Sequence, residues 1–307
     1  MQITTVTGPI APEDVGITLM HEHLIIDLCD HRSPFNKGED SLLNDVNLMA
    51  EELMIFKHEG GSTIVEMTNI GMGRDVIALK RIAETSGTHL VAATGYFHEN
   101  WYPAYMNQLS VNALADIMIR DLNSGVDDTG IRAGIIGEIG TLRHYISPSE
   151  ERVFRAAARA QRQVGVALST HTILGELALE QVALLREEGV DLRRVIIVHL
   201  GDTRDLELLE AVAQTGAYVQ IDHVGRGLPY PFDQHRVWVI TELVRRGYVE
   251  HILLSMDTCT RSDLRHWGGN GYGYLLSQFI PMLREAGVSE RAIEVMLIEN
   301  PRRALAS

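Results

Sequence analysis

The sequence predicts a single-domain (β/α)8 barrel that spans residues 1–307. Short apolar runs rich in β-branched residues alternate with longer segments of helical periodicity, a pattern typical of βα units around a parallel sheet. Eight such runs are present, and 307 residues are enough for a barrel, which usually takes about 250. No glycine-rich nucleotide loop follows an early strand, so a closed barrel is favoured over an open, doubly wound sheet.

The predicted strands are short and mostly apolar. A continuous run such as Ile196-Ile197-Val198 is expected where both faces of a strand are buried. The strands are predicted over residues 17–26, 62–67, 90–95, 133–139, 166–171, 195–199, 217–222 and 252–257.

Predicted helices fill the gaps between these strands. Met49, Leu53 and Phe56 recur at helical spacing in the first of them. Pro301 stands just past the last predicted helix, where a residue that cannot continue a helix is common. The helices are predicted over residues 45–58, 74–84, 111–122, 149–163, 175–188, 206–214, 236–246, 274–286 and 290–299.

Composition restricts the class of partner. The formal net charge is −14, and an acidic surface repels nucleic acid and anionic lipid. No apolar run approaches the roughly 20 residues that cross a bilayer, and no signal peptide is visible. The two cysteines, Cys29 and Cys259, are expected to be small buried residues. We therefore expect a cytoplasmic protein with a small-molecule substrate, no nucleic-acid or membrane partner, and a homodimer as the candidate assembly.

The first predicted strand carries two histidines, His21 and His23, on either side of Glu22. Side chains alternate along a strand, so the two imidazoles point to one face and Glu22 to the other. Such a pair can hold one metal ion, although two histidines at this spacing are a weak signal alone.

Four further ionisable residues stand at the ends of predicted strands. Glu138 lies on the fourth strand, His171 and His199 end the fifth and sixth, and Asp257 ends the eighth. The carboxyl ends of barrel strands converge on one mouth, where active sites lie. Because a buried charge is costly unless it is paired or bound to metal, these residues predict a metal centre.

Four histidines and two carboxylates exceed what one tetrahedral ion takes, so two ions are predicted. The donor set suits zinc, with manganese or cobalt as alternatives. One ion would take His21, His23 and Asp257, the other His171 and His199, with Glu138 as the bridge between them. A hydroxide held by both ions would be the nucleophile, and Asp257 would also act catalytically by accepting its proton.

These motifs resemble the phosphotriesterase-like branch of the amidohydrolase superfamily, and their order matches over nearly the whole chain. The resemblance implies a (β/α)8 barrel, a binuclear centre that is usually zinc, and hydrolysis of esters, lactones or phosphotriesters. The matching stretches are Gly8-Pro9-Ile10, Met20-His21-Glu22-His23, residues 133–141 around Glu138, Ser169-Thr170-His171-Thr172, Val198-His199 and Ser255-Met256-Asp257.

One departure narrows this resemblance. Members known for organophosphate hydrolysis bridge their metals with a carboxylated lysine on the fourth strand, where this chain has Gly137 and Glu138. The chain is similar to the sub-branch with a glutamate bridge, which includes phosphotriesterase homology proteins and lactonases of sugar phosphates. Both bridges are carboxylates, so the resemblance implies two-metal hydrolysis but does not favour organophosphates as substrates.

Loop residues near the mouth are candidates for substrate binding. Tyr96 and Phe97 follow the third strand, where lactonases of this family place a tyrosine over the metals. Arg226 follows the seventh strand, and Arg261 and Tyr274 follow the eighth. Arginine offers a two-pronged fork to phosphate or carboxylate, so these three predict an anionic substrate group. Packing on the barrel rim is the alternative for each.

A lactonase, with an anionic or phosphorylated sugar lactone as a candidate substrate, is the function that these residues favour. An amide or phosphoester would suit the same centre, because two metals polarise any of these bonds. A metal-loaded binding protein without turnover and a deaminase-like barrel with one ion are further alternatives. Metal stoichiometry separates the last alternative from a binuclear enzyme.

Overall fold

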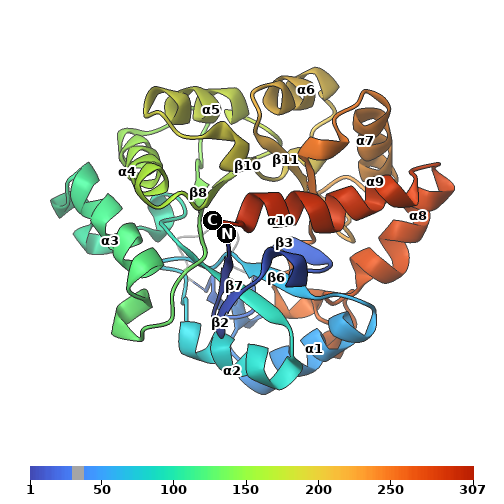
Figure 1. Ribbon diagram of the computed structural model, residues 1–307, viewed down its shortest axis with the longest axis horizontal. Coiled ribbons are helices and arrows are strands. Elements are labelled where there is room, and N and C mark those ends of the chain that lie inside the picture. The colour runs from blue at the N-terminus through green and yellow to red at the C-terminus, as the bar shows by residue number, and fades with distance from the viewer. Residues whose placement is uncertain (30–37) are drawn as a thin grey trace.

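The computed structural model describes residues 1–29 and 38–307, and these residues fold into a (β/α)8 barrel (Figure 1). The eight parallel strands are hydrogen-bonded in chain order, so each βα unit lies beside the next. They are β3 (Thr18–Glu22), β6 (Thr63–Glu66), β7 (His89–Thr94), β8 (Ile135–Gly140), β9 (Ala167–His171), β10 (Val195–Ile197), β11 (Tyr218–Ile221) and β12 (Ile252–Leu254).

The segment that follows β12 closes the ring against β3. Asp257 N donates to His21 O at 3.1 Å, and His23 N donates to Thr258 O at 3.1 Å. The predicted fold class is therefore confirmed. Several strands end earlier than predicted; for example, β10 stops at Ile197 because His199 turns into a left-handed conformation, with φ 62°.

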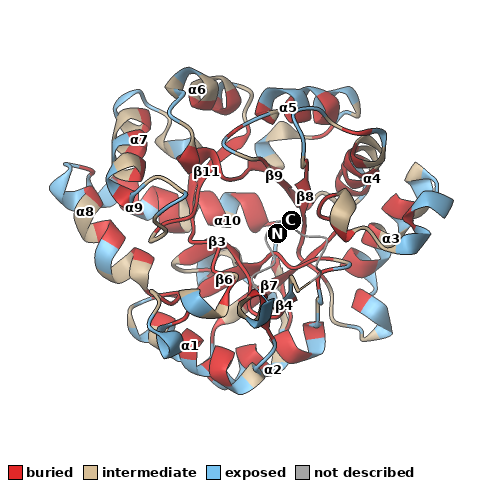
Figure 2. Ribbon diagram, turned by 180° about the vertical axis from the view of Figure 1, so that it is seen from behind, coloured by how far each residue is buried: buried red, intermediate tan, exposed pale blue. Residues whose placement is uncertain are grey.

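Helices surround the barrel and bury one face each, as the core positions in Figure 2 show. Several of the N-terminal ends are capped by a side chain; Asp45, for example, accepts from Asn47 N and Leu48 N at 3.0 Å at the start of the first helix. The helices are α1 (Val46–His58), α2 (Val76–Ser86), α3 (Val111–Asn123), α4 (Pro148–Val164), α5 (Ala178–Glu187), α6 (Leu206–Gln214), α7 (Asp233–Arg245), α8 (Ile280–Glu285), α9 (Glu290–Glu294) and α10 (Asn300–Leu305).

The C-terminal helix corrects one prediction. Pro301 does not follow the last helix but lies in the first turn of α10, which continues the chain from a π-helical turn at Val295–Glu299. A proline is tolerated there because the first turn needs no N–H donor from that position, and the wide π-turn leaves room before its ring.

Two short strands, β1 (Ile3–Thr5) and β2 (Gly8–Ile10), form a hairpin at the end of the barrel where the strands begin. Val6 N donates to Leu90 O at 2.9 Å, next to the first residue of β7. The two ends of the chain meet on this side, where Gln2 and Ser307 exchange backbone hydrogen bonds of 3.0 Å (Figure 1). The opposite end, where the strands finish, is thus left open as the mouth.

The remaining strand pair, β4 (Ile26–Asp27) and β5 (Leu42–Leu43), lies in the segment after β3. Among the described residues, no helix combines the length and the apolarity that a bilayer span requires.

Candidate metal centre

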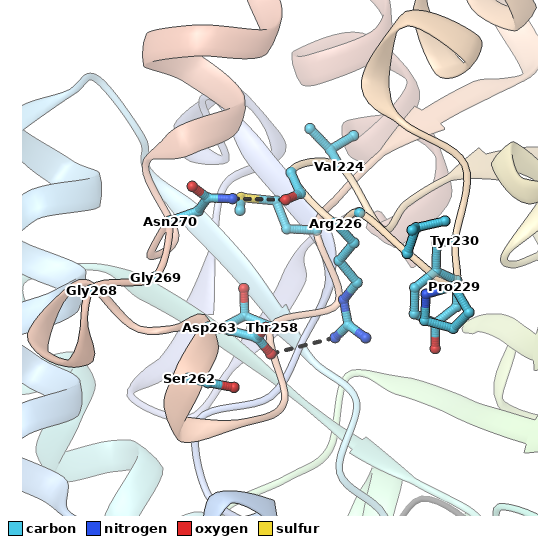
Figure 3. A pocket seen from close by; sticks show the side chains of 14 residues that line it. Val224, Arg226, Pro229, Tyr230, Thr258, Ser262, Asp263, Gly268, Gly269 and Asn270 are labelled. Carbon is cyan, nitrogen blue, oxygen red and sulfur yellow. Dashed lines mark hydrogen bonds and ion pairs between the residues drawn. The ribbon is translucent and has the colours of Figure 1, made fainter.

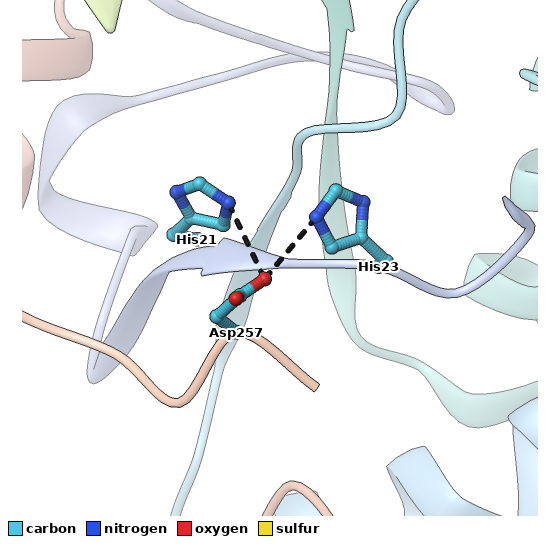
Figure 4. Close-up of side chains that lie close together, drawn as sticks. All are labelled: His21, His23 and Asp257. Carbon is cyan, nitrogen blue, oxygen red and sulfur yellow. Dashed lines mark ion pairs between the residues drawn. The ribbon is translucent and has the colours of Figure 1, made fainter. Parts of the chain in front are cut away.

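His21, His23 and Asp257 converge at the mouth of the barrel (Figure 4). Asp257 Oδ1 lies 3.5 Å from His21 Nε2 and 3.3 Å from His23 Nε2. His21 lies in β3 and His23 directly follows that strand, while Asp257 follows β12, next to β3 in the closed barrel. The three side chains are buried, and their donor atoms are close enough to share one ion.

A second group forms around Glu138, which points inward from β8. Glu138 Oε2 lies 3.1 Å from His171 Nδ1 and 3.7 Å from His199 Nε2, and these two ring nitrogens are 2.9 Å apart. His171 ends β9 and His199 follows β10, so three consecutive strands build this group.

Glu138 also reaches the first group. Its other oxygen, Oε1, lies 3.7 Å from His21 Nε2 and 3.9 Å from His23 Nε2. The carboxylate therefore stands between the two groups with one oxygen toward each. All six residues that the sequence predicts as ligands are brought together in one cluster.

The cluster also leaves polar atoms without partners. Both ring nitrogens of the fully buried His21, and Nε2 of His171, lack a hydrogen-bond partner among the described residues. A buried polar atom is costly unless it is satisfied, and imidazole and carboxylate are the donors that zinc and similar ions take. The residues present therefore fit a divalent-metal site.

The charges of the two carboxylates are consistent with this fit. Burial alone would raise the pKa of Glu138, but His21 and the hydrogen bonds from His171 and His199 hold that pKa well below its ordinary value. Burial likewise opposes the charge of Asp257, yet Arg226 and the neighbouring imidazoles keep its pKa well below the usual range. Both carboxylates are thus ionised, which is the form that binds a cation.

Three residues at the mouth, two of them from the cluster, have a left-handed backbone conformation. His199, His223 and Asp257 have φ values of 62°, 59° and 55°, each just after a barrel strand. The left-handed region is unfavourable for residues other than glycine and is concentrated at functional sites. The packing around the mouth must therefore stabilise the backbone at these three residues.

Neighbouring polar groups orient the imidazoles. His199 Nδ1 lies 2.8 Å from Asp222 Oδ1, so its other nitrogen, Nε2, faces the cluster. Thr68 Oγ1 lies 2.9 Å from His23 Nδ1 and donates to Glu66 Oε1 at 2.6 Å. Because Thr68 gives its one hydroxyl proton to Glu66, it accepts the Nδ1 proton of His23, which leaves the Nε2 lone pair free for an ion.

Replacing Thr68 by valine is expected to weaken metal binding by roughly 10–100-fold, because the isosteric side chain no longer fixes the His23 tautomer. The change is measured by competition with a chromogenic chelator. Thr68→Ser keeps the hydroxyl and is the matched control, expected to bind metal like the unmodified chain. Equal affinities for the valine and serine variants would contradict this role of Thr68.

The sequence did not predict the roles of His223 and Asp202. His223 Nε2 lies 2.9 Å from Asp257 Oδ2, and His223 Nδ1 lies 2.6 Å from Asp202 Oδ2. Asp202 is in turn held by the buried Arg236, whose Nη2 donates to it at 3.0 Å. This chain of hydrogen bonds leads from the metal cluster into the protein. His223, with His199 and Asp257, is also part of a third group of donors close enough for an ion.

A cavity of about 460 Å³ opens above the cluster. Its wall is largely apolar, with Ile26, Met72, Trp101 and Leu174 among its residues. Phe97 lines it and meets the His171 ring edge-on at 4.8 Å between centroids. The cavity is therefore shaped for a small, partly apolar molecule that reaches the cluster.

The predicted substrate-binding residues divide into two sets. Phe97 and Arg226 line the cavity. Tyr96 is fully buried outside its lining, with its hydroxyl 3.4 Å from that of Tyr105. The guanidinium of Arg261 donates to Leu42 O at 2.9 Å, and the Tyr274 hydroxyl donates to Asp233 Oδ2 at 3.0 Å. The structure thus does not bring Tyr96, Arg261 or Tyr274 to the cluster, because each of them is hydrogen-bonded to a partner outside it.

Arg226 stands between this cavity and a second, more polar one of about 360 Å³ (Figure 3). It donates to Asp257 O, lies 3.6 Å from Asp263 Oδ2, and packs 5.6 Å from the Tyr230 ring centroid. Arg226 Nη2 also donates to Cys259 Sγ at 3.1 Å, so Cys259 is a half-buried polar contact of the site and not the small buried apolar residue predicted.

The chain is similar to known proteins in both sequence and structure. Residues 1–305 match the model of the phosphotriesterase family. The phosphotriesterase homology protein of Escherichia coli (strain K12) is 40% identical over 94% of this chain and 97% of its own length. Its crystal structure, solved with phosphate in the active site, superimposes with a TM-score of 0.91 and covers 94% of this chain and 98% of that one.

Two further relatives have named activities. An N-acetyltaurine hydrolase of Tetraodon nigroviridis is 32% identical over 99% of this chain and 97% of its own length. A lactonase structure from Listeria monocytogenes is 27% identical, covers 100% of this chain and 99% of that one, and has a TM-score of 0.93. A match over nearly the whole chain, together with a 40% identical relative, shows that this hydrolase barrel belongs to the phosphotriesterase family.

Proposed function

We propose that the chain is a binuclear metal-dependent hydrolase that cleaves a small carboxylic ester, with a lactone as the leading substrate class. The position of Glu138 carries this proposal, because its two oxygens face two separate groups of metal-binding side chains. The ligands would be His21, His23 and Asp257 for one ion, His171 and His199 for the other, and Glu138 for both. Zinc is the metal that we propose.

Divalent ions bound here would supply a water of lowered pKa and polarise the carbonyl group. The residues of the chain would do the rest. Asp257, ionised and hydrogen-bonded to His223, is placed to take the proton of the attacking water. His223 can carry that proton onward, and Asp202 on its far side stabilises the imidazolium that forms. The leaving alkoxide would receive the proton along the same route.

The cavity supports a substrate with an apolar body and one polar contact. Phe97 and Trp101 form part of a wall that excludes water from the cluster. Among the residues that the structure describes, Arg226 is the one arginine that lines the cavity. We propose that Phe97 packs on the ring of the substrate and that Arg226 accepts its polar or anionic substituent.

An amide is the second candidate substrate. Relatives named as N-acetyltaurine hydrolases share about a third of the sequence over almost its entire length. The proton route from Asp257 to His223 suits amide cleavage as well, because an amine leaves only after protonation. A phosphoester is a third candidate, because phosphate occupies the active site of the E. coli relative.

One panel of assays distinguishes these classes. Zinc- or manganese-loaded protein is offered matched lactones, N-acyl amides of amino acids and aminosulfonates, and phosphoesters, each with and without an anionic substituent. Lactonase activity predicts acid release at a rate that depends on added metal. If the protein releases amine from an amide but no acid from any lactone, the substrate class is an amide and not a lactone. Two bound ions with no turnover of any class would favour a binding protein.

A further inference from the structure

Glu22 is a buried carboxylate that stands in the chain between the two histidines of the first group. It is the last residue of β3, and alternation from His21 to His23 turns its side chain away from the cavity. Its exposed fraction is 0%. A buried carboxylate on the side away from the substrate needs partners of its own, and the proposed reaction gives it none.

The partners of Glu22 all belong to the segment that carries Asp257. Oε1 accepts from Met256 N and from Ser255 Oγ, each at 2.8 Å, and Oε2 accepts from Thr258 N at 2.8 Å. The backbone N–H groups of the residues on both sides of Asp257 therefore donate to one carboxylate. Ser255 Oγ also accepts from His21 N at 2.8 Å, which ties the same segment to β3 a second time.

These hydrogen bonds stabilise the unusual backbone conformation of Asp257. The residue has a φ of 55°, a conformation that a non-glycine residue keeps only when its surroundings hold it there. Glu22 holds the N–H groups of the residues before and after Asp257, while the N–H of Asp257 itself donates to His21 O. Because Glu22 is the chain neighbour of both His21 and His23, it sets the position of Asp257 relative to those two side chains.

We propose that Glu22 is a positioning residue for the metal centre, which it serves by holding Asp257 at the distance where it can share an ion with His21 and His23. The inference rests on the proposed metal centre, but the hydrogen bonds that it invokes are made by the protein alone. It assigns a role to the middle residue of the His-Glu-His motif, which points away from the substrate and makes no contact with it.

The test is Glu22→Gln. Glutamine keeps the shape and can still accept from Met256 N, but its amide group would face the N–H of Thr258 with a second donor. Glu52→Gln is the matched control, because Glu52, in α1, is also buried and accepts from the backbone amide of His266, but is not one of the six residues of the cluster. Ser255→Ala removes one donor to Glu22 and serves as a milder variant should Glu22→Gln fold poorly.

Two quantities are measured, metal affinity and amide hydrogen exchange of the metal-free protein. For Glu22→Gln we expect the metal affinity to fall by roughly 10–100-fold. Exchange at Met256 and Thr258 should accelerate at least about tenfold while the rest of the barrel stays protected. Ser255→Ala should shift both quantities in the same direction by less. Glu52→Gln should leave both unchanged.

The outcomes separate this inference from the proposed function. Normal metal affinity and normal protection of residues 255–258 in Glu22→Gln would overturn the positioning role. Equal loss of protection throughout the barrel would also overturn it, because Glu22 would then support only global stability. If the unmodified chain binds no metal, the proposed function fails and the positioning role for a metal centre is overturned with it, whatever the exchange data show about Glu22.

Discussion

Replacing Asp257 by asparagine is expected to lower kcat by about 10²–10⁴-fold, the usual contribution of a positioned proton acceptor. Asparagine keeps the size and one oxygen of the side chain, so metal should be retained. It cannot accept the proton that Asp257 would pass to His223 across their 2.9 Å contact. The measurement is kcat on the best substrate of the panel, together with metal content by elemental analysis.

Asp263→Asn is the matched control for this experiment. Asp263 is a nearby carboxylate that also lies 3.6 Å from the Arg226 guanidinium, but it is outside the three groups of metal-binding side chains. Its replacement should change kcat by less than about tenfold, because no proton of the proposed reaction passes through it. A near-normal kcat for Asp257→Asn with full metal content would remove Asp257 from the mechanism.

Replacing Glu138 by glutamine is expected to have the largest effect on the metal content. The two oxygens of Glu138 face different groups, and an amide nitrogen in place of either one offers no lone pair to an ion. We expect bound metal to fall from two ions per chain to one or fewer. Turnover should fall by more than the roughly 10–100-fold that is typical when a residue outside the ligand set is changed.

Elemental analysis of the purified variant tests this expectation, and Glu52→Gln again controls for the loss of a buried carboxylate. The unmodified chain is measured first. One ion per chain before any substitution would favour the mononuclear alternative. Two ions retained in Glu138→Gln would show that Glu138 does not bridge them.

Sequence patterns predicted the barrel and also predicted that all six proposed ligands lie close together. Both predictions depend only on where the strands end. A run such as Ile196-Ile197-Val198 identifies a buried strand, and the residue after it, His199, must then reach the mouth. The same reasoning could have found His223, which follows β11 as His199 follows β10, had the position after every strand been treated alike.

Contacts between loops were beyond this reasoning. Nothing in the sequence near Arg261 indicates that its guanidinium turns to Leu42 O, because that partner lies more than two hundred residues earlier in the chain. The link from Asp202 to His223 likewise joins loops after two different strands. Strand periodicity predicts where a side chain starts, whereas the partner that it finds depends on how the loops pack.

The pairing of the two chain ends has a practical consequence for handling the protein. Gln2 and Ser307 are held together at the end of the barrel where the strands begin, opposite the mouth. A tether attached to either terminus would therefore orient every molecule on a solid support with its cavity facing the solution. A short peptide joining the two ends would span almost no distance, so circular permutants with new ends in exposed helix connections should keep the barrel and its cluster intact.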